Sequence, residues 1–198
     1  MRIGTTNKRK PNLAVPACAM LALFMSVFLS PALAGTPLTP EQANNYYQSC
    51  NAQRDQRMSE ATQDAFCACT SAEMMSRFSV EDIQLMNSGE DGARDVVNRM
   101  ILDIYAPCMH YPVQDLTEIG CLQDSAIEKI DAAMPRDDLC RCMGETTGHW
   151  FSTEGRALMA TILEQNPTIE DPMTPLMQSA EFRTRSHENM LACLQTYR

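Results

Sequence analysis

Eight of the nine cysteines fall into two groups with the same order of spacing. Each group has a single cysteine, then a C-x-C pair, then a last single cysteine. The first group is Cys50, Cys67, Cys69 and Cys108; the second is Cys121, Cys140, Cys142 and Cys193. An even number of cysteines is typical of a disulfide framework when the protein is exported. We therefore expect all eight to be bonded in disulfides.

The two groups belong to a longer internal similarity. Of the 20 positions from Cys67 to Met86, seven carry the same residue as the position 73 residues later. About one identity would be expected by chance from average residue frequencies. The period is too long for an ordinary solenoid repeat. The similarity predicts two tandem modules, residues 35–112 and 113–198, with the boundary at His110 to Val113.

Capping residues and apolar spacing predict an all-α protein. Ser, Thr and Pro precede most of the apolar stretches, as they do at helix starts, and Gly or Asn-Pro follows them. The expected helix starts are Thr39-Pro40, Ser59, Ser79, Pro135, Ser152 and Thr174-Pro175. The expected stops are Asn87-Ser88-Gly89 and Asn166-Pro167. One more helix, with Val97, Ile101 and Ile104 on its apolar face, should lead to Cys108.

The C-x-C spacing constrains how the cysteines can pair. Two residues that are two positions apart on a helix differ by about 200° around its axis, so they cannot bond each other. Each C-x-C should therefore link its helix to two different neighbours, the segments that carry the first and last cysteines of the same module. Two versions fit this spacing in the first module: Cys50–Cys67 with Cys69–Cys108, or Cys50–Cys69 with Cys67–Cys108.

The first 34 residues have the pattern of a cleaved signal peptide. A head with four basic and no acidic residues precedes a largely apolar run from Leu13 to Leu29, and Ala32-Leu33-Ala34 supplies small residues before Gly35. An uncleaved membrane anchor is the alternative, but the run is shorter than the roughly 20 apolar residues that a spanning helix needs. We expect export to the periplasm or the extracellular space, with no stable membrane anchor after cleavage.

Charge argues against two classes of partner. Without the four basic residues of the leader, the chain keeps 12 Lys and Arg against 25 Asp and Glu. Nucleic acids and anionic membrane surfaces are bound through clustered basic residues, and here the basic residues are scattered among acidic ones. We expect neither as a partner.

A thiol-redox or Cu(I)-handling protein is the main alternative to a purely structural role for the cysteines. Cu(I) favours thiolate and thioether ligands, and Cys140, Cys142 and Met143 would be the candidate ligands. However, a redox C-x-C normally lies at an exposed turn, and the residues between these cysteines, Ala68 and Arg141, are good helix formers. The structural interpretation is therefore preferred, and neither a metal nor another cofactor is expected.

Hydrolase activity is a second alternative. His110, His149 and His187 lie in no recognisable catalytic motif. The repeated Ser and Glu, Ser79 with Glu81 and Ser152 with Glu154, are explained by helix capping and by the helix dipole.

Trp150, the single tryptophan, could be a core residue or an anchor for a partner. The sequence thus favours an exported binding or structural module, with a protein among the candidate partners, and it predicts no catalytic residue.

Overall fold

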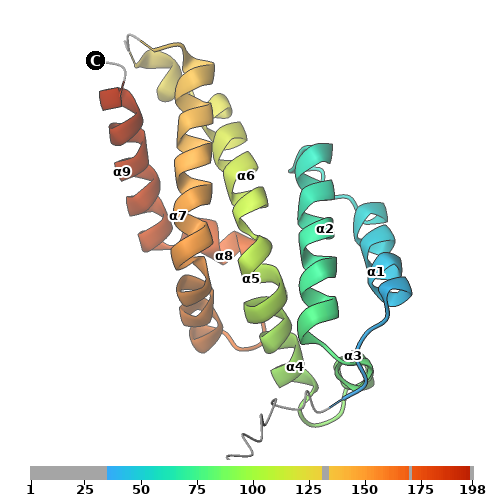
Figure 1. Ribbon diagram of the computed structural model, residues 1–198. Helices are drawn as coiled ribbons and strands as arrows, with labels where there is room; N and C mark the ends of the chain where they lie inside the picture. Colours follow the sequence, from blue (N-terminus) through green and yellow to red (C-terminus); the bar gives the residue numbers. More distant parts are fainter. Residues whose placement is uncertain (1–34, 131–133, 170, 197–198) are drawn as a thin grey trace, which may run out of the picture. The chain divides into compact units, whose positions relative to one another are not determined.

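The computed structural model describes residues 35–130, 134–169 and 171–196, and within them the regular structure is helical. The predicted signal peptide lies outside the described residues. The elements are α1 (Pro40–Ala52), α2 (Glu60–Arg77), α3 (Val80–Ser88), α4 (Ala93–Met100), a π-helical turn η1 (Ile101–Tyr105), α5 (Ala106–Cys108), α6 (His110–Gln123), a 3-10 turn η2 (Ile127–Lys129), α7 (Arg136–Gln165), α8 (Met173–Gln178) and α9 (Ala180–Thr196) (Figure 1). The prediction of an all-α protein is confirmed.

The first three helices begin at the predicted caps. The side chain of Thr39 accepts a hydrogen bond from the backbone N–H of Gln42, and Ser59 and Ser79 do the same at the starts of α2 and α3. Each bond satisfies a backbone donor that has no partner within its helix. Gly89 ends α3 with φ of 71°, a left-handed conformation that glycine adopts without steric cost.

The helical segments from α4 to α6 follow one another almost without interruption. Within η1 the backbone N–H of Ala106 donates to the carbonyl of Ile101, five residues earlier. This wider turn comes just before Pro107, whose ring would clash with a carbonyl four residues back in a regular α-helix. The backbone hydrogen bonds continue through Met109, which accepts from the N–H of Val113. The segment expected to hold the boundary between modules, His110 to Val113, is therefore the first turn of α6.

The predicted cap at Ser152 is wrong. Ser152 lies inside α7, and its hydroxyl donates to the carbonyl of His149 at 2.6 Å. The corresponding Ser79 is a cap because Thr36 lies beside it, where the carbonyl of Thr36 accepts from the N–H of Val80 at 2.9 Å. The extended segment around Thr36 and Pro37 makes the single isolated β-bridge of the described residues, between Pro37 and Ser79. The residues 73 positions after this segment lie at the junction of α5 and α6, where the backbone is in the helical region. They therefore form no extended segment beside Ser152, and the interruption between α2 and α3 has no counterpart in α7.

The predicted start of the last helix at Thr174-Pro175 is also wrong. These residues belong to the short helix α8. Just before this helix, the carboxylate of Asp171 accepts from the N–H of Met173 at 2.9 Å. The last helix, α9, starts later, and the hydroxyl of Ser179 accepts from the N–H of Phe182 at 3.1 Å. The expected stop of α7 at Asn166 is found.

Helix α7 packs most extensively against α6, and glycines set the distance between these two helices. A Cβ atom on Gly144 would lie 2.8 Å from the carbonyl oxygen of Gln114, and one on Gly148 would lie 2.9 Å from the Cβ atom of the same residue. Real Cβ atoms are rarely this close to other heavy atoms, so the close approach of the helices depends on the missing side chains.

Four disulfides connect the helices, and both cysteine groups pair in the same order. The bonds are Cys50–Cys67, Cys69–Cys108, Cys121–Cys140 and Cys142–Cys193. Of the two pairings that the spacing left open, the structure contains the first. Helix α2 is bonded to α1 and to α5, and α7 is bonded to α6 and to α9. Each C-x-C helix is thus covalently linked to two neighbouring helices.

Candidate ligand-binding pocket

An apolar pocket of about 370 Å³ lies among α1, α2, α3 and the segment from α4 to η1. Small-molecule sites usually occupy about 300–1,000 Å³, so this volume is at the lower end of that range. The lining residues are Leu38, Gln42, Ala43, Asn45, Tyr46, Met74, Val80, Ile83, Gln84, Met86, Met100 and Tyr105. None of them carries a charged side chain, although acidic residues are numerous in the chain.

The disulfides of the first group hold three walls of this pocket in place. Tyr46 lies one helical turn before Cys50 on α1, and Met74 lies two turns after Cys67 on α2. Tyr105 precedes Cys108 by three residues. Because residues spaced in this way share a helix face, each wall residue lies on the same side of its helix as a disulfide. The covalent links therefore fix the spacing between α1, α2 and η1 near the pocket.

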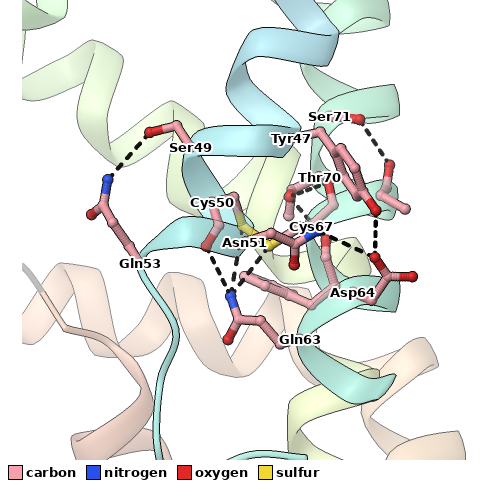
Figure 2. The surroundings of a disulfide bond; sticks show 12 residues. Tyr47, Ser49, Cys50, Asn51, Gln53, Gln63, Asp64, Cys67, Thr70 and Ser71 are labelled. Atoms are coloured by element: carbon pink, nitrogen blue, oxygen red, sulfur yellow. Dashed lines mark hydrogen bonds between the residues drawn. A yellow bond between two sulfur atoms is a disulfide. The ribbon is translucent and has the colours of Figure 1, made fainter. Parts of the chain in front are cut away.

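A buried glutamine completes the link between α1 and α2. The side-chain amide of Gln63 donates to the carbonyl oxygen of Cys50 at 3.2 Å and approaches the Sγ of Cys67 to 3.2 Å (Figure 2). Nearby, Asp64 accepts hydrogen bonds from the hydroxyl of Tyr47 and the side-chain amide of Asn51. These contacts hold the end of α1 against α2 in addition to the disulfide.

The fourth wall, α3, is held by the extended segment that precedes α1. The carboxylate of Glu81 accepts from the backbone N–H of Thr36 at 2.7 Å and from its hydroxyl at 2.8 Å. A hydrogen bond from the backbone N–H of Glu81 itself, together with the two from Thr36, lowers the pKa of this carboxyl group. The same segment carries Leu38, whose buried side chain lines the pocket. Residues 36–38 thus connect α3 to a buried side chain of the pocket.

Polar and apolar side chains are separated within the pocket. Leu38, Ala43 and Met74 are buried and form the floor. The amide side chains of Gln42, Asn45 and Gln84 are exposed and lie at the rim.

Two half-buried phenols, Tyr46 and Tyr105, lie between the floor and the rim. Burial raises the pKa of Tyr105 well above its ordinary value, and the neighbouring Tyr46 adds to the rise. The phenol of Tyr105 therefore stays neutral throughout the physiological pH range, so it brings no charge into the pocket.

No family model matches the chain, and no curated protein or solved structure matches it significantly. Within the residues that the structure describes, no helix is both long enough and apolar enough to cross a membrane.

The candidate metal ligands of the sequence do not form a thiolate site in the structure. Cys140 is bonded to Cys121 and Cys142 to Cys193, so the two cysteines of this C-x-C face different helices. Met143 is buried, and its sulfur lies 3.7 Å from the Sγ of Cys121. Among the described residues, no three His, Cys, Asp or Glu side chains gather as metal ligands.

The residues considered for hydrolysis are dispersed. His110, His149 and His187 belong to three different helices, α6, α7 and α9. His110 places its Nδ1 atom 2.9 Å from the carbonyl oxygen of Pro107, a contact within its own helical segment.

Trp150 is part of the core. It is 8% exposed and packs against the rings of Phe151 and Phe182, and the guanidinium of Arg185 lies 5.6 Å from its ring centre. This burial favours the core interpretation over an exposed anchor for a partner.

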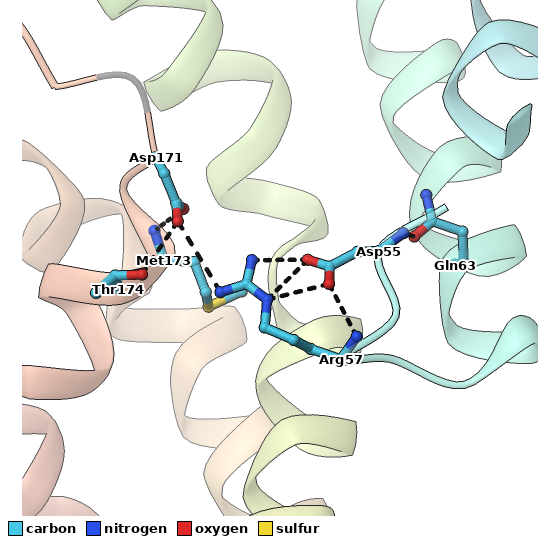
Figure 3. A network of polar contacts seen from close by, with 6 residues as sticks. All are labelled: Asp55, Arg57, Gln63, Asp171, Met173 and Thr174. Carbon is cyan, nitrogen blue, oxygen red and sulfur yellow. Dashed lines mark hydrogen bonds and ion pairs between the residues drawn. The ribbon is translucent and has the colours of Figure 1, made fainter. Parts of the chain in front are cut away.

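A polar network joins the loop between α1 and α2 to the segment before α8. Arg57 contacts Asp55 at 2.7 Å and Asp171 at 3.9 Å (Figure 3). Hydrogen bonds from Arg57 lower the pKa of Asp55. The side chains are partly exposed, and ion pairs of this kind contribute about 0–1 kcal/mol to stability. The network is best explained as a surface link between two segments distant in sequence.

A second hollow of about 590 Å³ lies among α6, α7, α8 and α9. It is wider and shallower than the pocket among α1, α2 and α3, and its lining includes the ionisable side chains of Asp124 and His187. Its border at Ile130 adjoins residues 131–133, which lie outside the described part of the chain. Its boundary is therefore less well defined than that of the pocket among α1, α2 and α3.

Only part of the pocket could be recognised in the sequence. Helical spacing alone places Ala43 and Tyr46 with Cys50 on one face of the first helix, and Ile83 and Met86 on one face of the third. Leu38, Met100 and Tyr105 were missed, because Leu38 comes from an extended segment, Met100 is the last residue of α4 and Tyr105 is the last residue of the π-helical turn. Helical periodicity alone does not show which of these side chains meet.

Proposed function

We propose that the chain is an exported binding module, made of two tandem disulfide-linked helical modules, whose ligand occupies the pocket among α1, α2 and α3. The signal-peptide pattern, the even number of cysteines and the four disulfides support export to an oxidising compartment. The identical pairing order in the two cysteine groups supports the duplication.

The observation that carries the proposal is an uncharged pocket whose walls are covalently linked. Packed helices normally leave little open space between their apolar side chains, and a pocket of this size leaves its apolar lining with fewer contacts than a packed interior gives. In a small exported module, such a cavity is more easily explained by a ligand that fills it than by structural needs alone.

The binding interpretation is favoured over thiol-redox or copper chemistry. The two cysteines of each C-x-C belong to different disulfides, and these disulfides lead to different helices. The cysteines of a C-x-C therefore do not form a dithiol pair with each other. Disulfides arranged in this way limit relative movement of the helices, and a rigid site binds its ligand with a smaller loss of conformational entropy.

Binding of a neutral hydrophobic fluorophore, N-phenyl-1-naphthylamine, tests the proposal. We expect the native protein to bind it with a stoichiometry near one, and we expect Ala43→Phe to abolish most of the binding. Ala43 is buried at the pocket floor, so a phenyl ring there would fill the cavity. The measurement is fluorescence titration of the oxidised protein.

Ala192→Phe is the matched control. Ala192 is exposed on α9 and does not line the pocket, so its replacement should leave fluorophore binding unchanged. Circular dichroism should show that both variants remain helical. Absence of binding to the native protein, or equal binding by the Ala43→Phe variant, would contradict the proposed site.

A further inference from the structure

We infer that the ligand is an uncharged molecule with an apolar body and a hydrogen-bonding head group, such as an alcohol or an amide. This inference rests on the proposed function and narrows it to one chemical class. It follows from the division of the pocket into an apolar floor and a rim of amides.

The floor and walls suit a flexible apolar body. Three methionines, Met74, Met86 and Met100, line the pocket together with aliphatic side chains. Methionine is unbranched and polarisable, so it adapts to the shape of its neighbour. The walls thus fit an alkyl chain or a small ring system and do not require one rigid shape.

The rim suits a head group that both donates and accepts hydrogen bonds. Gln42 and Asn45 come from α1 and Gln84 comes from α3, so amides lie on two sides of the opening. A side-chain amide supplies two donor hydrogens and an acceptor oxygen. The oxygen of Gln42 already accepts from the backbone N–H of Thr39 at 2.8 Å, so Gln42 offers its donor hydrogens to a head group. Asn45 and Gln84 can pair with a hydroxyl, carbonyl or amide group through either their donors or their acceptor.

Charges around the rim disfavour an ionised head group. The lining offers no cation for a carboxylate. Glu41 lies one turn before Asn45 on α1, and Glu81 and Asp82 lie in the first turn of α3, where Asp82 pairs with Arg99. A carboxylate would lose part of its hydration beside these acidic groups without gaining a partner. An ammonium would lose hydration as well. The acidic groups near the rim do not belong to the lining, so they would not pair with it inside the pocket.

Three ligands with the same chain and different head groups test this inference. Decanol, decanoate and decylammonium, each below its critical micelle concentration at pH 7.5, would displace N-phenyl-1-naphthylamine from the native protein. We expect decanol to displace it most effectively, decylammonium to bind about tenfold more weakly, and decanoate to bind most weakly of the three.

A charge placed at the rim should reverse part of this preference. Gln84→Arg puts a cation at the opening, so decanoate should gain at least about tenfold in affinity relative to decanol. Gln165→Arg adds the same charge at an exposed position at the end of α7, outside the pocket, and should leave the order of the three ligands unchanged.

The outcomes separate the two proposals. If the fluorophore does not bind the native protein at all, the proposed function fails. If it binds but decanoate or decylammonium displaces it as well as decanol does, the site stands and the inference about the head group is wrong. If Gln84→Arg leaves the affinity of decanoate relative to decanol unchanged, the placement of Gln84 at the rim of the binding site is wrong.

Discussion

Replacing both Cys69 and Cys108 by alanine should lower the free energy of unfolding by about 3–4 kcal/mol and weaken fluorophore binding about tenfold. The bond closes a sequence separation of 39 residues, and the chain-entropy treatment gives about 4 kcal/mol for a loop of this length as an upper guide. Binding should weaken because α2 and the segment carrying Tyr105 would no longer be linked beside the pocket. Urea unfolding and fluorescence titration provide the two measurements.

The double variant with alanine at Cys142 and Cys193 is the matched control. This disulfide closes a sequence separation of 51 residues, so a similar loss of stability is expected. It connects α7 to α9, which do not line the pocket, and fluorophore affinity should therefore stay close to that of the native protein. Equal weakening of binding in both variants would show that the first disulfide group has no specific role in shaping the pocket.

Alanine at Gly144 should destabilise the protein, whereas alanine at Gly120 should not. The new Cβ atom at position 144 would lie 2.8 Å from a backbone carbonyl oxygen of α6 and 3.1 Å from the Cβ atom of Glu118. Neither atom is the flexible end of a side chain, so the two helices would have to move apart. Overpacking of this kind costs about 1–3 kcal/mol.

Gly120 provides the same substitution without the clash. It lies in α6, and a Cβ atom there would meet no heavy atom within 4 Å. Since alanine favours a helix by about 1 kcal/mol over glycine, Gly120→Ala should raise the free energy of unfolding or leave it unchanged. In thermal and urea unfolding, Gly144→Ala should therefore lower the midpoint, and Gly120→Ala should raise it or leave it unchanged. A stabilising Gly144→Ala would mean that α6 and α7 are not in close contact at this position.

Local sequence signals were sufficient for the first half of the fold. Thr39, Ser59 and Ser79 each cap the helix that the sequence predicts, because a cap depends mainly on the residue and its next three neighbours. The same reasoning failed at Ser152. There a serine and a glutamate occur in the same local pattern, but no extended segment competes for the backbone hydrogen bonds, so α7 continues.

The pairing of the cysteines could be predicted only in part from helix geometry. The opposite directions of Cys67 and Cys69 on a helix predict links to two different neighbours, and the structure has them. Which cysteine faces which neighbour depends on the rotation of α2 about its own axis, and spacing does not determine that rotation. The Gly144-x-x-x-Gly148 pattern is visible in the sequence, but only the structure shows that α6 fills the space beside these glycines.

The methyl signals of methionine provide the most direct test of the proposed pocket. In a carbon–proton spectrum of protein labelled at the methionine methyl groups, titration with decanol should shift the signals of Met74, Met86 and Met100, which line the pocket. The signals of Met159 and Met173, which are buried elsewhere in the core, should stay in place. Shifts confined to Met177 and Met190, which line the second hollow, or no shifts at saturating decanol, would contradict the account.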